Sequence, residues 1–365
     1  MIKSDNSAFA CVRNPITHAL GAMFAGLLAI AVPSAADAGT TTPNGIWMSY
    51  AEIAKLPMSG KPWEKVKAAA DGWVGTPNIS DQDSKHDVNT MAIALVYART
   101  ANPAYRTKAA AAILSVIGTE KGGRTLALGR NLVSYVIAAD LIDLRSFDAA
   151  GDQKFRTWLS AVRNVKLDGK TLISTHEVRP NNWGTHAGAS RIAVDMYLGD
   201  TADLERAARV FKGWVGDRTA YAGFEYGDVS WQMDPKKPVG INPVGAMKQG
   251  HSIDGALPDD MRRGCSFKWQ PCTTGYAWEA MQGAVVEAQL LERAGYDAWN
   301  WGDKGIARST MFLYKLNQEV GGDWWATGDD TWQVWILNKA YKANFPTAAA
   351  KPGKNMGWTD WTHAS

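Results

Sequence analysis

The sequence predicts an all-α protein whose helices pair into hairpins and form an α/α toroid, an incomplete barrel, in a single domain. Segments rich in Ala and aliphatic residues follow one another in pairs. Short connections such as residues 101–103 (Ala-Asn-Pro) and 199–201 (Gly-Asp-Thr) join the members of a pair, and strand-like alternation is sparse. No strict repeat period is present, which favours a closed or nearly closed ring of hairpins over a regular repeat array.

The predicted helices follow in chain order. The hairpins pair residues 89–100 with 103–117, 126–144 with 148–165, 183–198 with 201–215 and 276–294 with 296–316, and residues 332–341 form a last helix. Between them, residues 219–274 contain many Gly, Pro, Asp and aromatic residues with little helical periodicity. A loop region this long within a helical domain is uncommon without a function, so we expect it to supply half of the site.

The N-terminus is expected to be a secretory signal peptide, residues 1–38. Lys3 and Arg13 precede an apolar run at 19–32, and residues 36–38 (Ala-Asp-Ala) place small side chains at the two positions that a signal peptidase reads. The run is too short for a membrane span, and no later segment approaches ~20 uninterrupted apolar residues. We therefore expect a mature domain at residues 39–365 that is periplasmic or secreted and does not bind a membrane.

The cysteines agree with export. Cys11 leaves with the signal peptide, and Cys265 and Cys272 remain as an even pair in a compartment where disulfides persist. We expect a disulfide between them, with two free thiols as the alternative.

The composition excludes several classes of protein. A hydrophobic content of 46% with 21% charged residues is ordinary for a globular protein, and a net charge of +3 with dispersed Lys and Arg argues against a nucleic-acid partner. The six histidines lack metal-ligand spacing, so we expect no metal and no cofactor. The 17 Trp are unusual, because an indole face is suited to stacking on sugar rings, although most are expected in the core. We expect a monomer.

The remaining polar residues suit proton removal from a carbon next to a carboxylate. Negative charge builds on that carboxylate, so an enzyme aims amide, guanidinium or imidazole donors at its oxygens and places a base near the proton. Residues of these types gather between positions 181 and 276: Asn181, Asn182, His186, His251, Arg262, Arg263 and Tyr276.

Two motifs resemble those of the alginate lyase superfamily of polysaccharide lyases. Residues 181–185 read Asn-Asn-Trp-Gly-Thr and precede an apolar helix, residues 254–263 read Asp-Gly-Ala-Leu-Pro-Asp-Asp-Met-Arg-Arg, and Tyr276 begins a later helix. The family has Asn-Asn-His-Gly-Thr, then Asp-Gly-x-x-Pro-x-Glu-x-x-Arg and a Tyr. The resemblance implies an α/α toroid that cleaves an anionic polysaccharide, a polyuronate, by β-elimination.

The resemblance also implies roles for individual residues. Asn182, helped by Arg263, would neutralise the substrate carboxylate, and Tyr276 would donate a proton to the leaving glycosidic oxygen and is also a candidate base. Trp183 stands where the family has His, so the imidazole would come from His186 or His251. Three more residues are expected to contact the substrate: Asn181, Trp183 and Arg262.

The sequence departs from the family at two further points. Asp260 replaces a Glu, and the loop between Cys265 and Cys272 lengthens the spacer before Tyr276. The combination of Trp183 and His186 looks more like lyases of β-1,4-linked glucuronate, so glucuronan or oxidised cellulose is the first expected substrate and mannuronate-rich alginate the second.

Other interpretations remain open. Asn181 and Asn182 are good helix caps, and Asp259 and Asp260 are placed to pair locally with the two arginines. An inverting glycoside hydrolase would need two carboxylates across a cleft, and four residues could supply them: Glu225, Asp228, Asp254 and Asp260. A non-catalytic module for an acidic glycan would use Arg and Trp alone.

Overall fold

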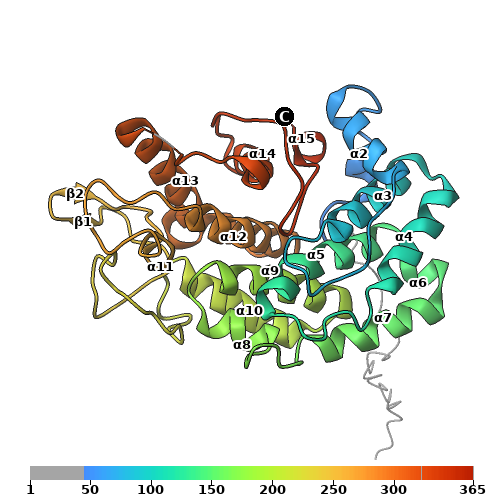
Figure 1. Cartoon of the computed structure of the whole chain (residues 1–365), viewed down its shortest axis with the longest axis horizontal. Helices are drawn as coiled ribbons and strands as arrows, with labels where there is room; N and C mark the ends of the chain where they lie inside the picture. Colours follow the sequence, from blue (N-terminus) through green and yellow to red (C-terminus); the bar gives the residue numbers. More distant parts are fainter. Residues whose placement is uncertain (1–44, 322, 365) are drawn as a thin grey trace, which may run out of the picture. The chain divides into compact units, whose positions relative to one another are not determined.

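Helices make up most of the described part of the chain, residues 45–321 and 323–364 of this computed structural model (Figure 1). In chain order they are α1 Tyr50–Ile53, α2 Lys61–Asp71, α3 His86–Thr100, α4 Pro103–Ser115, α5 Thr125–Leu141, α6 Leu144–Phe147, α7 Ala149–Val162, α8 Leu172–Val178, α9 Asn182–Leu198, α10 Thr201–Trp214, α11 Pro258–Met261, α12 Tyr276–Arg293, α13 Trp301–Val320, α14 Thr331–Tyr341 and α15 Thr359–Thr362. The prediction of an all-α fold is confirmed. The predicted signal peptide lies outside the described residues.

The predicted loop region contains little regular structure. Its two strands, β1 Met247–Lys248 and β2 His251–Ser252, form an antiparallel hairpin with Lys248 opposite His251. The four-residue helix α11 follows. The expectation of a long irregular segment at 219–274 is therefore confirmed.

Most predicted helices begin and end within a few residues of their observed bounds, but the helix expected at 296–316 differs. A 3₁₀ turn at Ala298–Asn300 comes first, and α13 continues to Val320. Gly302, Asp303 and Lys304 have φ of 60°, 54° and 58°, which is the left-handed region, so a right-handed helix can become regular only after them.

Six observed helices were not predicted: the four-residue helices α1, α6, α11 and α15, and the longer helices α2 and α8. α2 buries Trp63, Val66 and Ala70, whose spacing of three and four residues is helical. α8 has only seven residues and includes β-branched side chains, which lowers its intrinsic helix propensity. It is held by a capping box, in which Thr171 Oγ1 accepts from Ser174 N at 3.0 Å and Ser174 Oγ accepts from Thr171 N at 2.9 Å.

Helices α3, α5, α9 and α12 lie side by side in that order (Figure 1). Along α5, Gly129 lies against Ala187 of α9, and further on Val133 N donates to Ser190 Oγ at 3.0 Å. Contacts between α9 and α12 likewise advance along both helices together. Helices α5, α9 and α12 therefore run in the same direction, and their N-termini lie at the same end.

Glycines allow α9 to approach both neighbours closely. A Cβ at Gly129 of α5 would stand 2.9 Å from the Ala187 nitrogen, and one at Gly283 of α12 would stand 2.2 Å from the Thr185 carbonyl carbon. Real side chains do not come this close to backbone atoms. The helix that begins with Asn182 is therefore clamped on two sides by backbone contact.

A buried ion-pair network anchors α9 to other helices. Arg191, which is fully buried, donates to Asp203 Oδ2 at 2.9 Å and to Glu177 Oε1 at 3.0 Å, while Arg163 at the end of α7 donates to the buried Asp195 at 2.6 Å. Removing one partner would leave a buried charge uncompensated, which costs about 3–5 kcal/mol. This network connects α7, α8, α9 and α10.

Asp87 in the first turn of α3 is a buried acid without a strong partner. Among the described residues neither carboxylate oxygen has a hydrogen bond of good geometry, and the N–H groups of Asp87 and Val88 offset its burial only in part. Burial raises the pKa of Asp87 from 3.8 to about 8. The folded protein therefore holds a proton there that the unfolded chain releases.

This proton predicts a pH-dependent stability. Between about pH 7 and 8 the folded state binds more protons at Asp87 than the unfolded state, so its contribution to the free energy of unfolding falls as pH rises, by about 1 kcal/mol per pH unit. The window lies above the ordinary histidine pKa of about 6.5, so buried histidines stay neutral in both states. Asp87→Asn mimics the protonated acid, and urea unfolding across this window should show a flatter profile for the variant. Parallel profiles for the two proteins would contradict the assignment.

Candidate active site

The N-terminal ends of three parallel helices meet around Glu279. Glu279 lies in the first turn of α12, Asn182 is the first residue of α9, and Arg130 is in the second turn of α5. Asn182 Nδ2 and Arg130 Nη2 each donate to Glu279 Oε2 at 2.7 Å. Because helix N-termini carry partial positive charge, this end of the bundle favours negative groups.

The segment after α14 adds a second cation to this cluster. Lys354 Nζ lies 3.2 Å from Glu279 Oε1 and 3.8 Å from Asp329. The neighbouring residue Asn355 fixes this segment, because its N–H donates to the Arg130 carbonyl at 2.9 Å and its own carbonyl accepts from Ser134 Oγ at 2.6 Å. The C-terminal segment thus contributes directly to the site.

Glu279 is ionised in this setting. Its burial opposes the negative charge, but Arg130 and Lys354, with hydrogen bonds from Lys354 and Asn182, lower its pKa below the ordinary value. The carboxylate holds the surrounding donors in fixed positions. Its side chain and that of Lys354 remain about one fifth exposed, whereas Arg130 is 4% exposed, so Lys354 is the more accessible cation.

Asn182 forms the floor of the cluster. Its Nδ2 donates to Glu279, its Oδ1 accepts from Arg263 Nη1 at 2.9 Å, and its backbone N–H donates to Asp260 Oδ1 at 3.2 Å. These partners fix the orientation of the amide. Asn182 is almost fully buried, so it acts on a bound molecule mainly by positioning Arg263.

Arg263 and Tyr276 form the more open part of the site. The Arg263 guanidinium carbon lies 3.3 Å from the centre of the Tyr276 ring, a cation–π contact, and both residues are half-buried. Within the described chain the Tyr276 hydroxyl has no hydrogen-bond partner and is available to a ligand. The structure therefore brings three predicted residues together: Asn182, Arg263 and Tyr276.

The spacer between Arg263 and Tyr276 is closed by the predicted disulfide. Cys265 and Cys272 are bonded, with their Cα atoms 5.7 Å apart. The Trp231 indole N–H donates to the Cys265 carbonyl at 2.9 Å and holds this loop against the core. The longer spacer thus forms a side loop, and Arg263 and Tyr276 still meet.

Asn181 and Arg262 contact Asp259. Asn181 Nδ2 donates to Asp259 at 2.9 Å and its Oδ1 caps α9 by accepting from Trp183 N at 3.2 Å, while Arg262 Nε donates to Asp259 at 2.7 Å. The adjacent Asp260 is fully buried, and burial together with Asp259 raises its pKa well above the ordinary value. These contacts support the floor of the site, in agreement with the capping and local-pairing alternatives.

Trp183 lies beside two other arginines. The guanidinium carbons of Arg124 and Arg179 each stand 5.1 Å from its ring. The indole is half-buried, and the side chain of Arg124 is 59% exposed. Trp183 therefore belongs to a cationic surface next to the N-terminus of α9.

His186 is enclosed in the core. Its Nδ1 hydrogen-bonds Asn355 Oδ1, and because Asn355 Nδ2 donates to the Gly129 carbonyl at 3.1 Å, Nδ1 must carry the hydrogen. Burial and the nearby Arg130 hold the pKa of His186 well below its usual range. A fully buried neutral imidazole has no direct access to a polysaccharide.

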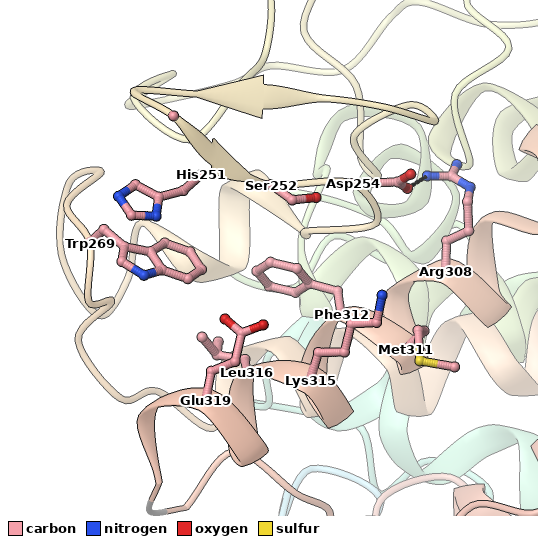
Figure 2. Close-up of a pocket in the computed structure, with 11 residues that line it drawn as sticks. His251, Ser252, Asp254, Trp269, Arg308, Met311, Phe312, Lys315, Leu316 and Glu319 are labelled. Carbon is pink, nitrogen blue, oxygen red and sulfur yellow. Dashed lines mark hydrogen bonds and ion pairs between the residues drawn. The ribbon is translucent and has the colours of Figure 1, made fainter.

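His251 lies in a different place, on the β1–β2 hairpin. Its ring stacks on Trp269, with centroids 4.5 Å apart and planes 12° from parallel. Within the described residues no hydrogen bond, ion pair or ring contact joins it to Asn182, Arg263 or Tyr276. Figure 2 shows His251 and Trp269 at one end of a cavity between the hairpin and α13.

Four residues of the cluster were not predicted: Arg130, Glu279, Lys354 and Asn355. Arg130 and Glu279 sit inside helical segments where a charged residue gives no signal of its own. The one local signal near Lys354 is its position in the short turn between Gly353 and Gly357. Only the helix packing brings these groups together.

No family model, curated protein or solved structure was found to match this chain. In the described part, no group of three or more His, Cys, Asp or Glu side chains is arranged to hold a metal ion. None of the helices described there has both the length and the apolar character needed to cross a membrane.

Proposed function

We propose that this protein is a polysaccharide lyase that cleaves a β-1,4-linked polyuronate by β-elimination and leaves an unsaturated uronate at the new non-reducing end. The observation that carries the proposal is the free Tyr276 hydroxyl beside Arg263, at the cationic end of three helices. The proposal includes an α/α toroid as the scaffold, as in the alginate lyase superfamily that the two motifs resemble, and the mostly helical fold supports it.

The reaction needs one proton acceptor and one proton donor. A base takes the proton from C5, the C5–H electron pair forms the C4–C5 double bond, and the C4–O bond breaks with its electrons going to the glycosidic oxygen, which gains a proton. In β-D-glucuronate and β-D-mannuronate the C5 hydrogen and the C4 oxygen lie on the same face of the ring. Tyr276 takes the C5 proton and returns it to the leaving oxygen, so a single residue serves as both base and acid and the protons balance.

Charge that builds on the substrate carboxylate is stabilised by fixed cations. In the described chain the Arg263 guanidinium donates to Asn182 and has further N–H groups available to a ligand, and Lys354 is partly exposed at the other side of Glu279. Donors held in place before the reaction stabilise an enolate-like species without reorganisation. Asn182 positions Arg263, and His186 supports the cluster from below through Asn355.

The preferred substrate is glucuronan or oxidised cellulose, with mannuronate-rich alginate second. The preference rests on Trp183 and His186, which depart from the alginate lyase pattern toward lyases of β-1,4-glucuronate. We also propose that the protein acts in the periplasm or outside the cell, with residues 1–38 as its signal peptide, and the disulfide supports this location.

Three of the four carboxylates that a hydrolase could use already have partners in the structure. Asp228 pairs with Ser266 at 2.6 Å, Asp254 with Arg308 at 2.6 Å, and Asp260 is buried under Asn182. An inverting hydrolase would need two such acids facing one another about 6.5–9.5 Å apart.

Product analysis tests the function. The purified mature protein, incubated separately with glucuronan, alginate and hyaluronan, is expected to produce the ultraviolet absorbance of a C4–C5 unsaturated uronate first on glucuronan. Mass spectrometry of the products then gives fragments without added water. Saturated ends would show a hydrolase, and binding without any cleavage would show a glycan-binding module.

A further inference from the structure

The β1–β2 hairpin, the disulfide loop and α13 surround a cavity of about 350 Å³ that the elimination chemistry does not use. Figure 2 shows Trp269 and His251 on the hairpin side and Phe312, Lys315 and Glu319 rising from α13 on the other. The cavity thus combines aromatic faces with a cation and a carboxylate.

Two charged side chains of α13 that line the cavity, Lys315 and Glu319, are not paired with each other. Lys315 and Glu319 are one helical turn apart, a spacing at which opposite charges usually pair, although Lys before Glu is the weaker order. Both are exposed, and neither has a hydrogen bond or ion pair in the described chain. In Figure 2 the two side chains point apart and toward the hairpin.

The neighbouring Arg308 differs from Lys315. Its guanidinium donates to Asp254 Oδ1 and to the Asn242 carbonyl, each at 2.6 Å, and to the Gly302 carbonyl at 2.8 Å. These bonds hold the hairpin against α13, and they occupy the N–H donors of the Arg308 guanidinium. Lys315 is therefore the cation that the cavity offers to a ligand.

The aromatic groups offer a rigid apolar surface. Stacking on His251 fixes the Trp269 ring, and the disulfide closes the loop that carries Trp269. Phe312 is nearly buried in the cavity wall. Aromatic faces of this kind pack on the apolar C–H face of a sugar ring.

We propose that this cavity is a second, non-catalytic subsite that holds one uronate residue of the same polymer that is cleaved at Tyr276; the choice of polymer rests on the proposed function. The uronate carboxylate binds Lys315, its hydroxyls bind Glu319, and its ring lies on Trp269 and Phe312. His251 then acts by positioning Trp269 and does not accept the C5 proton.

One polymer chain is long enough to occupy both sites. Trp269 follows Arg263 by six residues, which span at most about 22 Å when fully extended, and the disulfide shortens that path. Occupying two sites with one chain raises affinity for long chains over short ones. The subsite therefore predicts a dependence of binding on chain length.

Calorimetric titration tests the subsite, with Tyr276→Phe as the parent so that cleavage is slow on the timescale of the titration. The probes are a long and a short oligoglucuronate and a neutral cello-oligosaccharide of the longer length. Lys315→Met keeps the aliphatic stem and removes the charge. We expect it to raise the Kd for the long oligoglucuronate about tenfold, as loss of a charged hydrogen bond does, with a smaller change for the short one. Lys154→Met is the matched control and should leave Kd unchanged, because Lys154 on α7 is exposed and has no hydrogen bond or ion pair among the described residues.

The outcomes separate the subsite from the lyase function. Equal Kd values for Lys315→Met and Lys154→Met, or equal binding of the neutral oligosaccharide, would overturn the subsite even if the wild type cleaves glucuronan. Binding that depends on Lys315 in a protein that never cleaves would support the subsite and remove the lyase. A His251→Gln variant that has lost all turnover while binding the long oligoglucuronate normally would return the base role to His251 and overturn its positioning role.

Discussion

Tyr276→Phe is expected to reduce turnover of glucuronan by about 10²–10⁴-fold, the range over which positioned acid–base groups act. The change removes only the hydroxyl oxygen, and the aromatic ring that makes the cation–π contact with Arg263 is kept. Because the hydroxyl has no hydrogen-bond partner in the described chain, its loss leaves no buried group unsatisfied. The variant should therefore fold and bind oligoglucuronate like the wild type while initial rates of double-bond formation fall.

Tyr97→Phe is the matched control for this experiment. Tyr97 on α3 is half-buried, and the Arg106 guanidinium carbon lies 5.3 Å from the centre of its ring. Among the described residues its hydroxyl has no hydrogen-bond partner. The same oxygen is thus removed from a similar setting away from the site. Turnover by Tyr276→Phe within tenfold of that by Tyr97→Phe would assign the proton transfer to another residue.

Gly283→Ala is expected to lower the free energy of unfolding by about 3 kcal/mol or more, at the upper end of overpacking substitutions. The new Cβ would meet the Thr185 carbonyl carbon at 2.2 Å and the His186 nitrogen at 2.4 Å. Backbone cannot rotate away as a side chain does, so α9 and α12 must separate. That movement would also pull Asn182 from Glu279, and turnover should fall with stability.

Gly275→Ala is the control at the start of the same helix. Its φ of −78° suits any residue, and no atom outside its chain neighbours lies within 4 Å of a Cβ there. Urea unfolding should show a change within about 1 kcal/mol, toward higher stability. If Gly283→Ala unfolds at the same urea concentration as Gly275→Ala, α9 and α12 are not in backbone contact.

The pairing of Asn182 with Arg263 and Tyr276 illustrates what motifs can predict. Their order in the sequence suggested that they share a site, and the disulfide loop explains how an unusually long spacer still allows it. The sequence groups His186 and His251 with them because Trp183 stands where the family has His, so that another imidazole is expected. In the structure His186 is buried in the core and His251 stacks on Trp269 at the hairpin. Residue type predicts neither the burial of a side chain nor its position.

Most of the long helices follow from the sequence, because apolar periodicity, caps and turn residues act over a few neighbouring positions. The sequence also determined the disulfide, through the pairing of two nearby cysteines. The composition of the charged cluster, in contrast, follows from how distant segments pack. Arg130 and Lys354 stand 149 and 75 positions from Glu279 in the chain. Close helix packing at glycines brings Arg130 to this carboxylate, and the hydrogen bonds of Asn355 bring Lys354 there. Electrostatic partners at such separations are set by packing, which no local pattern encodes.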